Sequence, residues 1–233
     1  MDKQTRRERV WDELEESGVA RFPYPPHGRI PNFAGADEAA ERLTTTDAWQ
    51  AADTLKANPD APQLPVRRAA LRAGKTVYMA VPRLRDERCF LRLHPADIED
   101  IDHATTVGGS AEAGQPVDPE EMPPVDLIVS GSVAVSEAGS RVGKGEGYSD
   151  LEFAVLREFG LVGEDTPVAT TVHERQVRTD AIDTDPHDVP LDVVVTPERT
   201  IDVPPSTKPC GLDWPALSEE RIADIPILQR LRD

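Results

Sequence analysis

The stretch Gly139–Asp150, GSRVGKGEGYSD, says most about the fold of this chain. It follows Leu127–Val135 (LIVSGSVAV), an apolar run that is interrupted by Gly-Ser and predicts a buried strand. It precedes Leu151–Phe159, whose apolar spacing predicts a helix that Gly160 ends. A strand that passes through a glycine-rich turn into a helix is typical of α/β proteins with a parallel sheet.

The rest of the chain repeats this alternation of helices and strands. We expect helices at 3–18, 36–56, 66–72 and from Ser218 onward, strands at 76–81, 90–93, 168–172 and 191–196, and a loop with one helical turn at 94–124. The order predicts an α/β protein of three layers, α/β/α, with a mostly parallel sheet and helices on both faces. We expect one α/β domain at 1–205 and a helical tail at 206–233.

Composition limits the class of protein. The 233 residues carry a net charge of -17, with 21 arginines but only five lysines, which favours a protein adapted to concentrated salt. An ordinary acidic protein is the alternative. The acidity argues against a nucleic-acid partner, which needs a basic surface. No apolar run approaches the ~20 residues of a membrane span, and the charged first residues are unlike a signal peptide, so we expect a cytoplasmic protein.

The glycine-rich stretch has the parts of a phosphate-binding loop. Glycines alternate at 143, 145 and 147, which lets backbone N–H groups turn toward an anion, and the following helix adds its positive end. Arg141 and Lys144 supply full charges. The spacing matches neither GxxxxGK[ST] nor GxGxxG, so a flexible turn without a ligand is the alternative.

Charged residues near this loop extend the hypothesis. Lys3 and Arg7 lie four residues apart, so they share one helix face and could meet one anion, unless that face is simply solvated. Asp150 could hold Mg²⁺ beside phosphate, or it could be only a helix N-cap. Glu146 is the second carboxylate of the loop and also needs a cation between itself and a phosphate.

These residues resemble the 5-formyltetrahydrofolate cyclo-ligase family. That family has a first helix with Lys and Arg four apart, as Lys3 and Arg7 are, and a loop RLGxGxGYYD that is similar to Arg141–Asp150 (RVGKGEGYSD). It also has a stretch similar to 187–196, HDVPLDVVVT. Segments such as GKGEGYSDLEFAVL look closer to a divergent branch, the methenyltetrahydrofolate synthetase domain-containing proteins. Animal members of that branch add an RNA-recognition module, which we do not expect here.

The resemblance implies an ATP-dependent ligase that phosphorylates the formyl oxygen of 5-formyltetrahydrofolate and closes the ring to 5,10-methenyltetrahydrofolate. The cofactors would be ATP and Mg²⁺, and the partners ATP and a folate or folate-like molecule. Arg141 and Lys144 would be the catalytic cations, and Asp150 would bind the metal. The nucleotide would contact Lys3, Arg7, Gly143, Lys144, Gly145, Glu146, Gly147 and Tyr148.

Some residues depart from the family pattern. Ser149 replaces the second loop tyrosine, Ser136 replaces the Asp of an upstream AFD segment, and a folate-side Glu is missing near Asp60. Two alternatives therefore stay open: a nucleotide-binding interaction protein without this activity, and an enzyme that acts on another heterocycle, such as a thiamin-related compound. The sequence does not indicate an oligomeric state.

Overall fold

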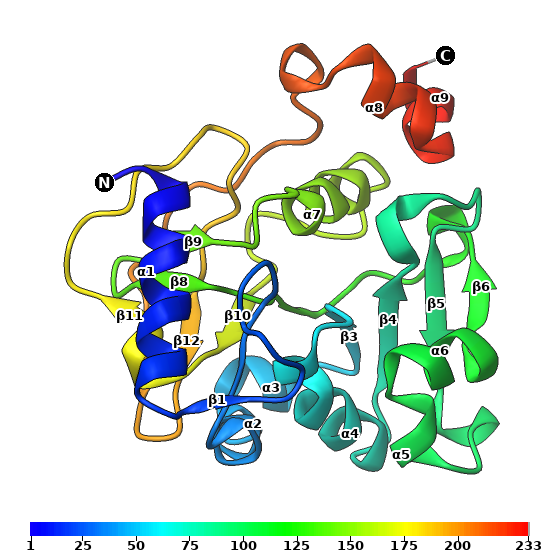
Figure 1. Ribbon diagram of the computed structural model, residues 1–233. Coiled ribbons are helices and arrows are strands. Elements are labelled where there is room, and N and C mark those ends of the chain that lie inside the picture. The colour runs from blue at the N-terminus through cyan, green and yellow to red at the C-terminus, as the bar shows by residue number, and fades with distance from the viewer. Residues whose placement is uncertain (233) are drawn as a thin grey trace.

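A central sheet of eight strands organises the protein, whose computed structural model describes residues 1–232. The strands run in the spatial order β13-β12-β10-β7-β3-β4-β5-β6 (Figure 1). Their bounds are β3 (Thr54–Ala57), β4 (Thr76–Ala80), β5 (Phe90–Leu93), β6 (Gln115–Val117), β7 (Leu127–Val129), β10 (Val168–Thr171), β12 (Val193–Val195) and β13 (Thr200–Asp202). The five strands from β12 to β4 are parallel, whereas β5, β6 and β13 pair antiparallel at the edges. The expected mostly parallel sheet is confirmed.

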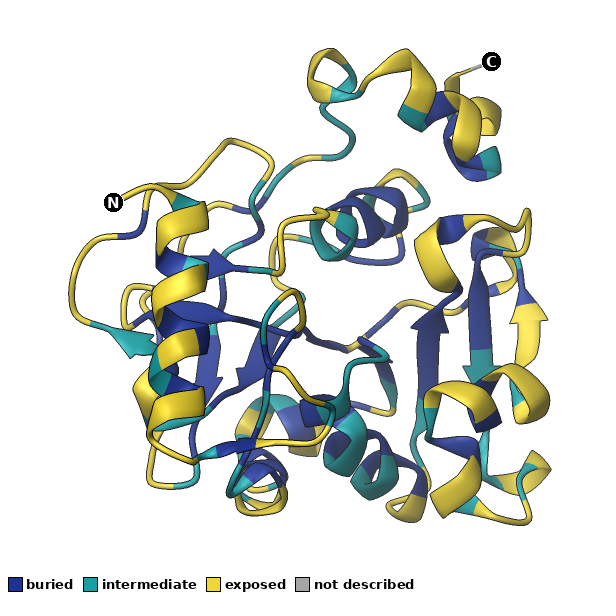
Figure 2. Ribbon diagram, viewed as in Figure 1, coloured by how far each residue is buried: buried dark blue, intermediate teal, exposed yellow. Residues whose placement is uncertain are grey.

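Helices cover both faces of this sheet, as expected for an α/β/α fold. The α-helices of the described residues are α1 (Lys3–Glu16), which packs on a second sheet, α2 (Ala36–Leu43), α3 (Asp47–Ala51), α4 (Leu64–Arg72), α5 (Ile101–Ala104), α6 (Val107–Ala113), α7 (Tyr148–Glu158), α8 (Glu219–Asp224) and α9 (Pro226–Arg232). Side chains alternate along each strand, so Leu127 and Val129 of β7 join a cluster with α2, α3 and α4. Ile128 faces the other way, toward α7. The buried residues therefore form a dark band between exposed outer surfaces (Figure 2).

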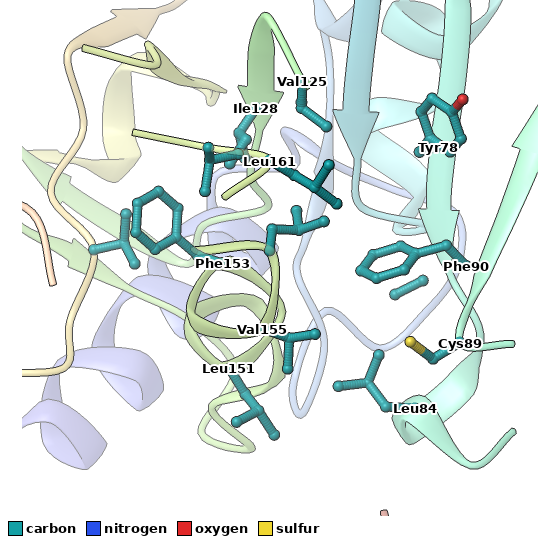
Figure 3. Packing of buried hydrophobic residues seen from close by; sticks show 14 of the residues in the cluster. Tyr78, Leu84, Cys89, Phe90, Val125, Ile128, Leu151, Phe153, Val155 and Leu161 are labelled. Carbon is teal, nitrogen blue, oxygen red and sulfur yellow. The ribbon is translucent and has the colours of Figure 1, made fainter. Parts of the chain in front are cut away.

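The cluster on the α7 face is the larger of the two. Phe153 and Val155 of α7 gather there with Ile128 of β7 and Phe90 of β5 (Figure 3). Ile222 and Leu228, from α8 and α9, belong to the same cluster, so the C-terminal helices pack against the α7 side. Burial of such side chains contributes about 1.5–3 kcal/mol each. This packing fixes α7, and with it the loop that precedes α7.

A second, three-stranded sheet carries the first helix. It consists of β11 (Val177–Arg178), β8 (Ala134–Ser136) and β9 (Arg141–Val142), and the short strands β1 (Ala20–Arg21) and β2 (Asn32–Phe33) form a separate pair. The expected single strand at 127–135 is wrong, because β7 and β8 lie in different sheets. The chain leaves β7 at Ser130 and Gly131, where a Cβ on Gly131 would lie 3.0 Å from Ile30. The Gly-Ser interruption is thus a crossover between sheets.

Two further expectations are wrong. The predicted helix 36–56 is α2, α3 and then the central strand β3. Because β3 is short and buried on both faces, its sequence TLKA shows no alternation of apolar and polar residues. The segment 94–124 contains α5, α6 and β6 rather than a loop with one turn. Its glycines suggested a loop, but Gly109 is needed inside α6 because a Cβ there would lie 1.9 Å from the carbonyl oxygen of His103.

The remaining expected strands, and the helices at 3–18, 66–72 and 218 onward, lie within a few residues of their predicted positions. The boundary at residue 205 stays a prediction. Among residues 1–232, no helix combines the length and the apolarity that crossing a membrane requires.

Candidate active site

A cleft of about 420 Å³ opens where the parallel strands end. It lies beside β3 and β7, where the order of strands reverses, which is the usual ligand position in open α/β sheets. One wall is the glycine-rich loop and the start of α7, and the other is apolar, with Met79, Val81 and Leu91. Asn58, after β3, and Glu152, on α7, supply polar groups between the two walls.

The glycine-rich loop presents a run of unpaired donors. Gly145 has φ +110 and Gly147 has φ +67, conformations that side chains other than glycine rarely adopt. Within residues 1–232, no acceptor receives a hydrogen bond from any backbone N–H group between Gly143 and Asp150. Such groups need a partner when they are covered, and an anion with several oxygens can supply it. The loop therefore fits the phosphates of a nucleotide.

Arg7 of α1 contacts this loop. Its Nε donates to the carbonyl oxygen of Gly143 at 2.7 Å, and its guanidinium lies 3.4 Å from where a Cβ on Gly145 would be. Partial burial lowers the pKa of Arg7, although the carboxylates of Asp188 and Asp2 oppose that shift. The structure thus brings the first helix to the loop, as the spacing of Lys3 and Arg7 suggests.

Lys3 has different partners. Its Nζ donates to Asp185 at 2.7 Å and to Asp188 at 2.5 Å, in the segment before β12. Burial lowers the pKa of Lys3, but the hydrogen bonds to both carboxylates outweigh it, so the pKa is raised overall. Lys3 is not among the residues that line the cleft, whereas Lys144 is. The two members of the predicted Lys-Arg pair therefore have separate contacts.

Arg141 and Asp150 form a nearly buried pair. The Nη2 group of Arg141 donates to both carboxylate oxygens of Asp150, at 2.6 and 2.7 Å, and Nη1 donates to the carbonyl oxygen of Gly131 at 3.0 Å. Asp150 also accepts from the backbone N–H of Val189. Helix α7 begins at Tyr148 with Gly147 as its N-cap, so the alternative of Asp150 as an N-cap is wrong.

Asp150 offers the kind of ligand that Mg²⁺ takes. It is an oxygen donor at the edge of the cleft, next to the unpaired N–H groups, and Mg²⁺ is usually held by one or two carboxylates and by phosphate oxygens. Its two oxygens already accept from Arg141, so a cation would share this carboxylate with the guanidinium. The donor type fits the metal in chemistry, and the pairing with Arg141 holds the carboxylate in one orientation.

Lys144 and Glu146, at the tip of the loop, are more exposed to solvent than Arg141 and Asp150. Lys144 pairs with Glu146 at 2.7 Å, and both side chains are about 40% exposed. Arg221 of α8 donates to the carbonyl oxygen of Glu146 at 2.8 Å and lies 4.7 Å over the ring of Tyr148. The C-terminal tail therefore contacts the loop directly, which the sequence alone did not indicate.

Sequence analysis missed a buried polar network at the base of the cleft. Lys56 of β3 donates to Glu152 of α7 and to the amide oxygen of Asn58. Ser149 also donates to that oxygen and to Ser130. A signal existed, because lysine is scarce in this chain and Lys56 is one of the five. The sequence pattern predicts a helix over 36–56, so it does not indicate that Lys56 lies in the central strand.

Arg67 supports the same end of the cleft. It is buried and donates to the carbonyl oxygens of Asn58 and Asp60, at 2.6 and 3.0 Å, and to that of Thr105. Burial lowers its pKa to about 10. Burial likewise raises the pKa of Asp60, although the charge of Lys144 opposes the shift. Arg67 thus fixes the backbone from which Asn58 and Asp60 enter the cleft.

The sequence of this chain is similar to those of known proteins. A sequence model of the 5-formyltetrahydrofolate cyclo-ligase family matches residues 2–197. The methenyltetrahydrofolate synthase domain-containing protein of Mus musculus is 42% identical over 239 residues, covering 100% of this chain and 64% of its own length. The Homo sapiens protein of that name is 38% identical over 237 residues, covering 100% and 62%. This chain therefore spans less than two thirds of the length of these relatives.

A solved structure shares the fold. The NMR structure of Aquifex aeolicus 5,10-methenyltetrahydrofolate synthetase superimposes with a TM-score of 0.56 at 20% identity, covering 89% of this chain and 96% of that one.

Proposed function

The chain belongs to the 5-formyltetrahydrofolate cyclo-ligase family, and from that premise we propose that it uses ATP to convert 5-formyltetrahydrofolate to 5,10-methenyltetrahydrofolate. The formyl oxygen would attack the γ-phosphorus, and ADP would leave. The neighbouring folate nitrogen would then attack the formyl carbon and lose its proton, and inorganic phosphate would leave with the former formyl oxygen. The observation that carries this proposal is the run of unpaired N–H groups from Gly143 to Asp150.

Phosphoryl transfer depends on positioning of the reactants and on charge stabilisation more than on covalent catalysis by the protein. The N–H groups of the loop would hold the phosphate oxygens, and Lys144 would leave Glu146 to neutralise the transferred group. Arg7 and Arg141 would act differently, since both already bind loop or crossover carbonyls. Their charges would complement the phosphates while their hydrogen bonds keep the loop in shape. The contacts of Lys3 favour a role in anchoring residues 185–188 to the first helix.

Mg²⁺ bound with ATP would neutralise part of the phosphate charge, and Asp150 is the residue that would hold it. The pair with Arg141 would hold the Asp150 carboxylate in one orientation before the nucleotide binds. Because the cleft also holds Glu146, Glu152 and Asp60, the site needs cations to accept a polyphosphate.

The far side of the cleft would take the acceptor. Its apolar wall of Met79, Val81 and Leu91 can cover the face of a flat ring, and Asn58 and Glu152 offer polar groups beside it. With this division, the reacting formyl group would lie between the ring site and the phosphate-binding loop. A heterocycle other than folate is the second candidate, because Ser149 stands where the family pattern has a tyrosine, and it donates to Asn58 at the base of the cleft.

The experiment is a turnover assay in high KCl with ATP, Mg²⁺ and 5-formyltetrahydrofolate, following the near-ultraviolet absorbance of the methenyl product and the release of phosphate. Lys144→Ala should lower kcat/KM by about 10²-fold, as the loss of one charge-stabilising contact does. Arg175→Ala removes an exposed cation outside the cleft and should leave the rate unchanged. ATP binding without methenyl product would reject the folate reaction and favour one of the two alternatives. No ATP binding would reject the phosphate-binding loop itself.

A further inference from the structure

The buried network at the base of the cleft contains an ion pair that phosphate binding does not use. Lys56 is 1% exposed and Glu152 5%, and they are joined by a direct hydrogen bond between Nζ and Oε2. Lys56 points to the α7 face because its neighbours Leu55 and Ala57 point to the opposite face of β3. Burying such a pair gains little stability on balance, so its presence beside a cleft needs another reason.

Two groups of this network remain available to a ligand. Within residues 1–232, Lys56 is the only donor to the side-chain carboxylate of Glu152, and it contacts Oε2, so Oε1 has no protein partner. The Lys56 ammonium and the Ser149 hydroxyl both donate to Oδ1 of Asn58, at 3.3 Å each. An ammonium can only donate, so this contact fixes the orientation of the amide and leaves its NH₂ group unpaired among the described residues. Asn58 and Glu152 both line the cleft.

We propose that Glu152 and Asn58 recognise the edge of the acceptor's heterocycle, with Glu152 accepting from ring N–H groups and Asn58 donating to an adjacent carbonyl oxygen. A 2-amino-4-oxo-pyrimidine ring offers this pattern: its amino group and ring N–H are donors, and its 4-oxo group is an acceptor. The apolar wall then covers the ring face. The inference rests on the proposed function, and it names the residues that select the ring.

Lys56 is a positioning residue in this arrangement. Its ammonium donates to Glu152 and to Asn58 and so holds both side chains in place, but Lys56 does not itself line the cleft. Arg67 has the same role on the backbone, since it holds the carbonyl oxygens of Asn58 and Asp60. The groups that face Glu152 are thus Lys56 from β3 and Asn58 from the turn after it, while Asp60 and Lys144 lie along the same cleft.

The test measures binding by calorimetry, with a non-hydrolysable ATP analogue present. The two probes are 5-formyltetrahydropterin, which has the 2-amino-4-oxo edge, and its 2,4-diamino analogue, which has a donor in place of the 4-oxo acceptor. Wild type should bind the oxo ring at least tenfold more tightly, because the diamino edge leaves Asn58 without an acceptor and its N3, which carries no proton, offers Glu152 no donor. Glu152→Gln should weaken binding of the oxo ring by about 10- to 100-fold, since a charged hydrogen bond is lost. Glu158→Gln, on the same helix but outside the cleft, should match wild type.

A second variant guards against misfolding. Asn58→Leu keeps the size of the side chain and removes the donor, so it should weaken binding of the oxo ring and reduce its preference, while Glu152 still selects for the ring N–H. Lys56→Met tests positioning: it should weaken binding of the oxo ring and reduce its preference over the diamino ring, because Glu152 and Asn58 both lose the donor that holds them in place. A purely structural role would lower the melting temperature and leave the preference for the oxo ring as it is in wild type.

The outcomes separate the two proposals. If the oxo ring binds but the variants neither weaken it nor change the preference, the roles of Glu152 and Asn58 are wrong and the proposed function stands. If neither ring binds while the ATP analogue does, both are overturned. Affinity for the ATP analogue should stay within twofold of wild type in Glu152→Gln, and a larger loss would assign Glu152 to the nucleotide instead.

Discussion

Gly145→Ala is the most informative single substitution in the phosphate-binding loop. Gly145 has φ +110, a region that is essentially closed to residues with a Cβ, and an alanine held there costs about 1–3 kcal/mol. The added Cβ would lie 3.4 Å from Cζ of Arg7, which is an ordinary contact, so the backbone carries the effect. In the variant, the exposed loop can relax to another conformation. Only the wild-type conformation, which is strained for alanine, directs the N–H groups toward an anion.

The affinity for ATP should therefore fall while the fold persists. If restoring the wild-type loop conformation costs about 1–3 kcal/mol of the binding free energy, the Kd for an ATP analogue rises by about 5- to 150-fold. Calorimetric titration measures this change, and the melting temperature should stay within about 2 °C of wild type, because the relaxed loop releases the strain.

Gly160→Ala is the matched control. Gly160 also has positive φ, +67, and nothing lies within 4 Å of its added Cβ, but it ends α7 at the other end from the loop. This variant should lose about 1 kcal/mol of stability, which lowers the melting temperature by about 2–4 °C, and should bind ATP normally. Wild-type ATP affinity in Gly145→Ala would refute the reasoning, because it would mean that the conformation of this loop does not determine phosphate binding.

Three further predictions follow from the rest of the structure. Arg221→Ala removes the hydrogen bond to Glu146 and the contact with Tyr148, and should raise the Kd for ATP about 3- to 10-fold in the same titration; an unchanged Kd would mean that the C-terminal tail does not shape the loop. Burial raises the pKa of the Cys89 thiol to about 12, so at pH 8 a thiol reagent should modify only the exposed Cys210 until the protein is denatured; two fast-reacting thiols in the native protein would contradict this. With a net charge of -17, the melting temperature should rise between 0.1 M and about 1 M KCl, where the Debye length shortens to about 3 Å; a flat or falling curve by scanning calorimetry would argue against salt adaptation.

The sequence predicted those parts of the fold where local pattern and position agree. Strands β4 and β10 are rich in β-branched residues, β5 is a short apolar run, and α1 and α4 have helical spacing, so each could be predicted. The central strand β3 was missed because it is buried on both faces and contains Lys56, whose partner Glu152 is 96 residues away. No local pattern reports a partner at that distance.

The candidate site was likewise predictable only where its residues depend on local sequence. The glycines at 143, 145 and 147 could be identified because their conformation is a local property of the chain. Lys3 and Arg7 share a helix face, but only the tertiary structure shows that Arg7 meets Gly143 and that Lys3 meets the segment at 185–188. The contact between Arg221 and the loop likewise depends on how the tail packs on α7, which neither spacing nor composition records.

The most direct test of the proposed reaction follows one oxygen atom. The protein is incubated with ATP, Mg²⁺ and 5-formyltetrahydrofolate that carries ¹⁸O in its formyl group, and the released phosphate is analysed by mass spectrometry. Phosphorylation of the formyl oxygen requires that this atom leave with the phosphate, so we expect one ¹⁸O in each phosphate molecule formed with the methenyl product. Unlabelled phosphate accompanying that product, or phosphate release with no methenyl product, would contradict the account.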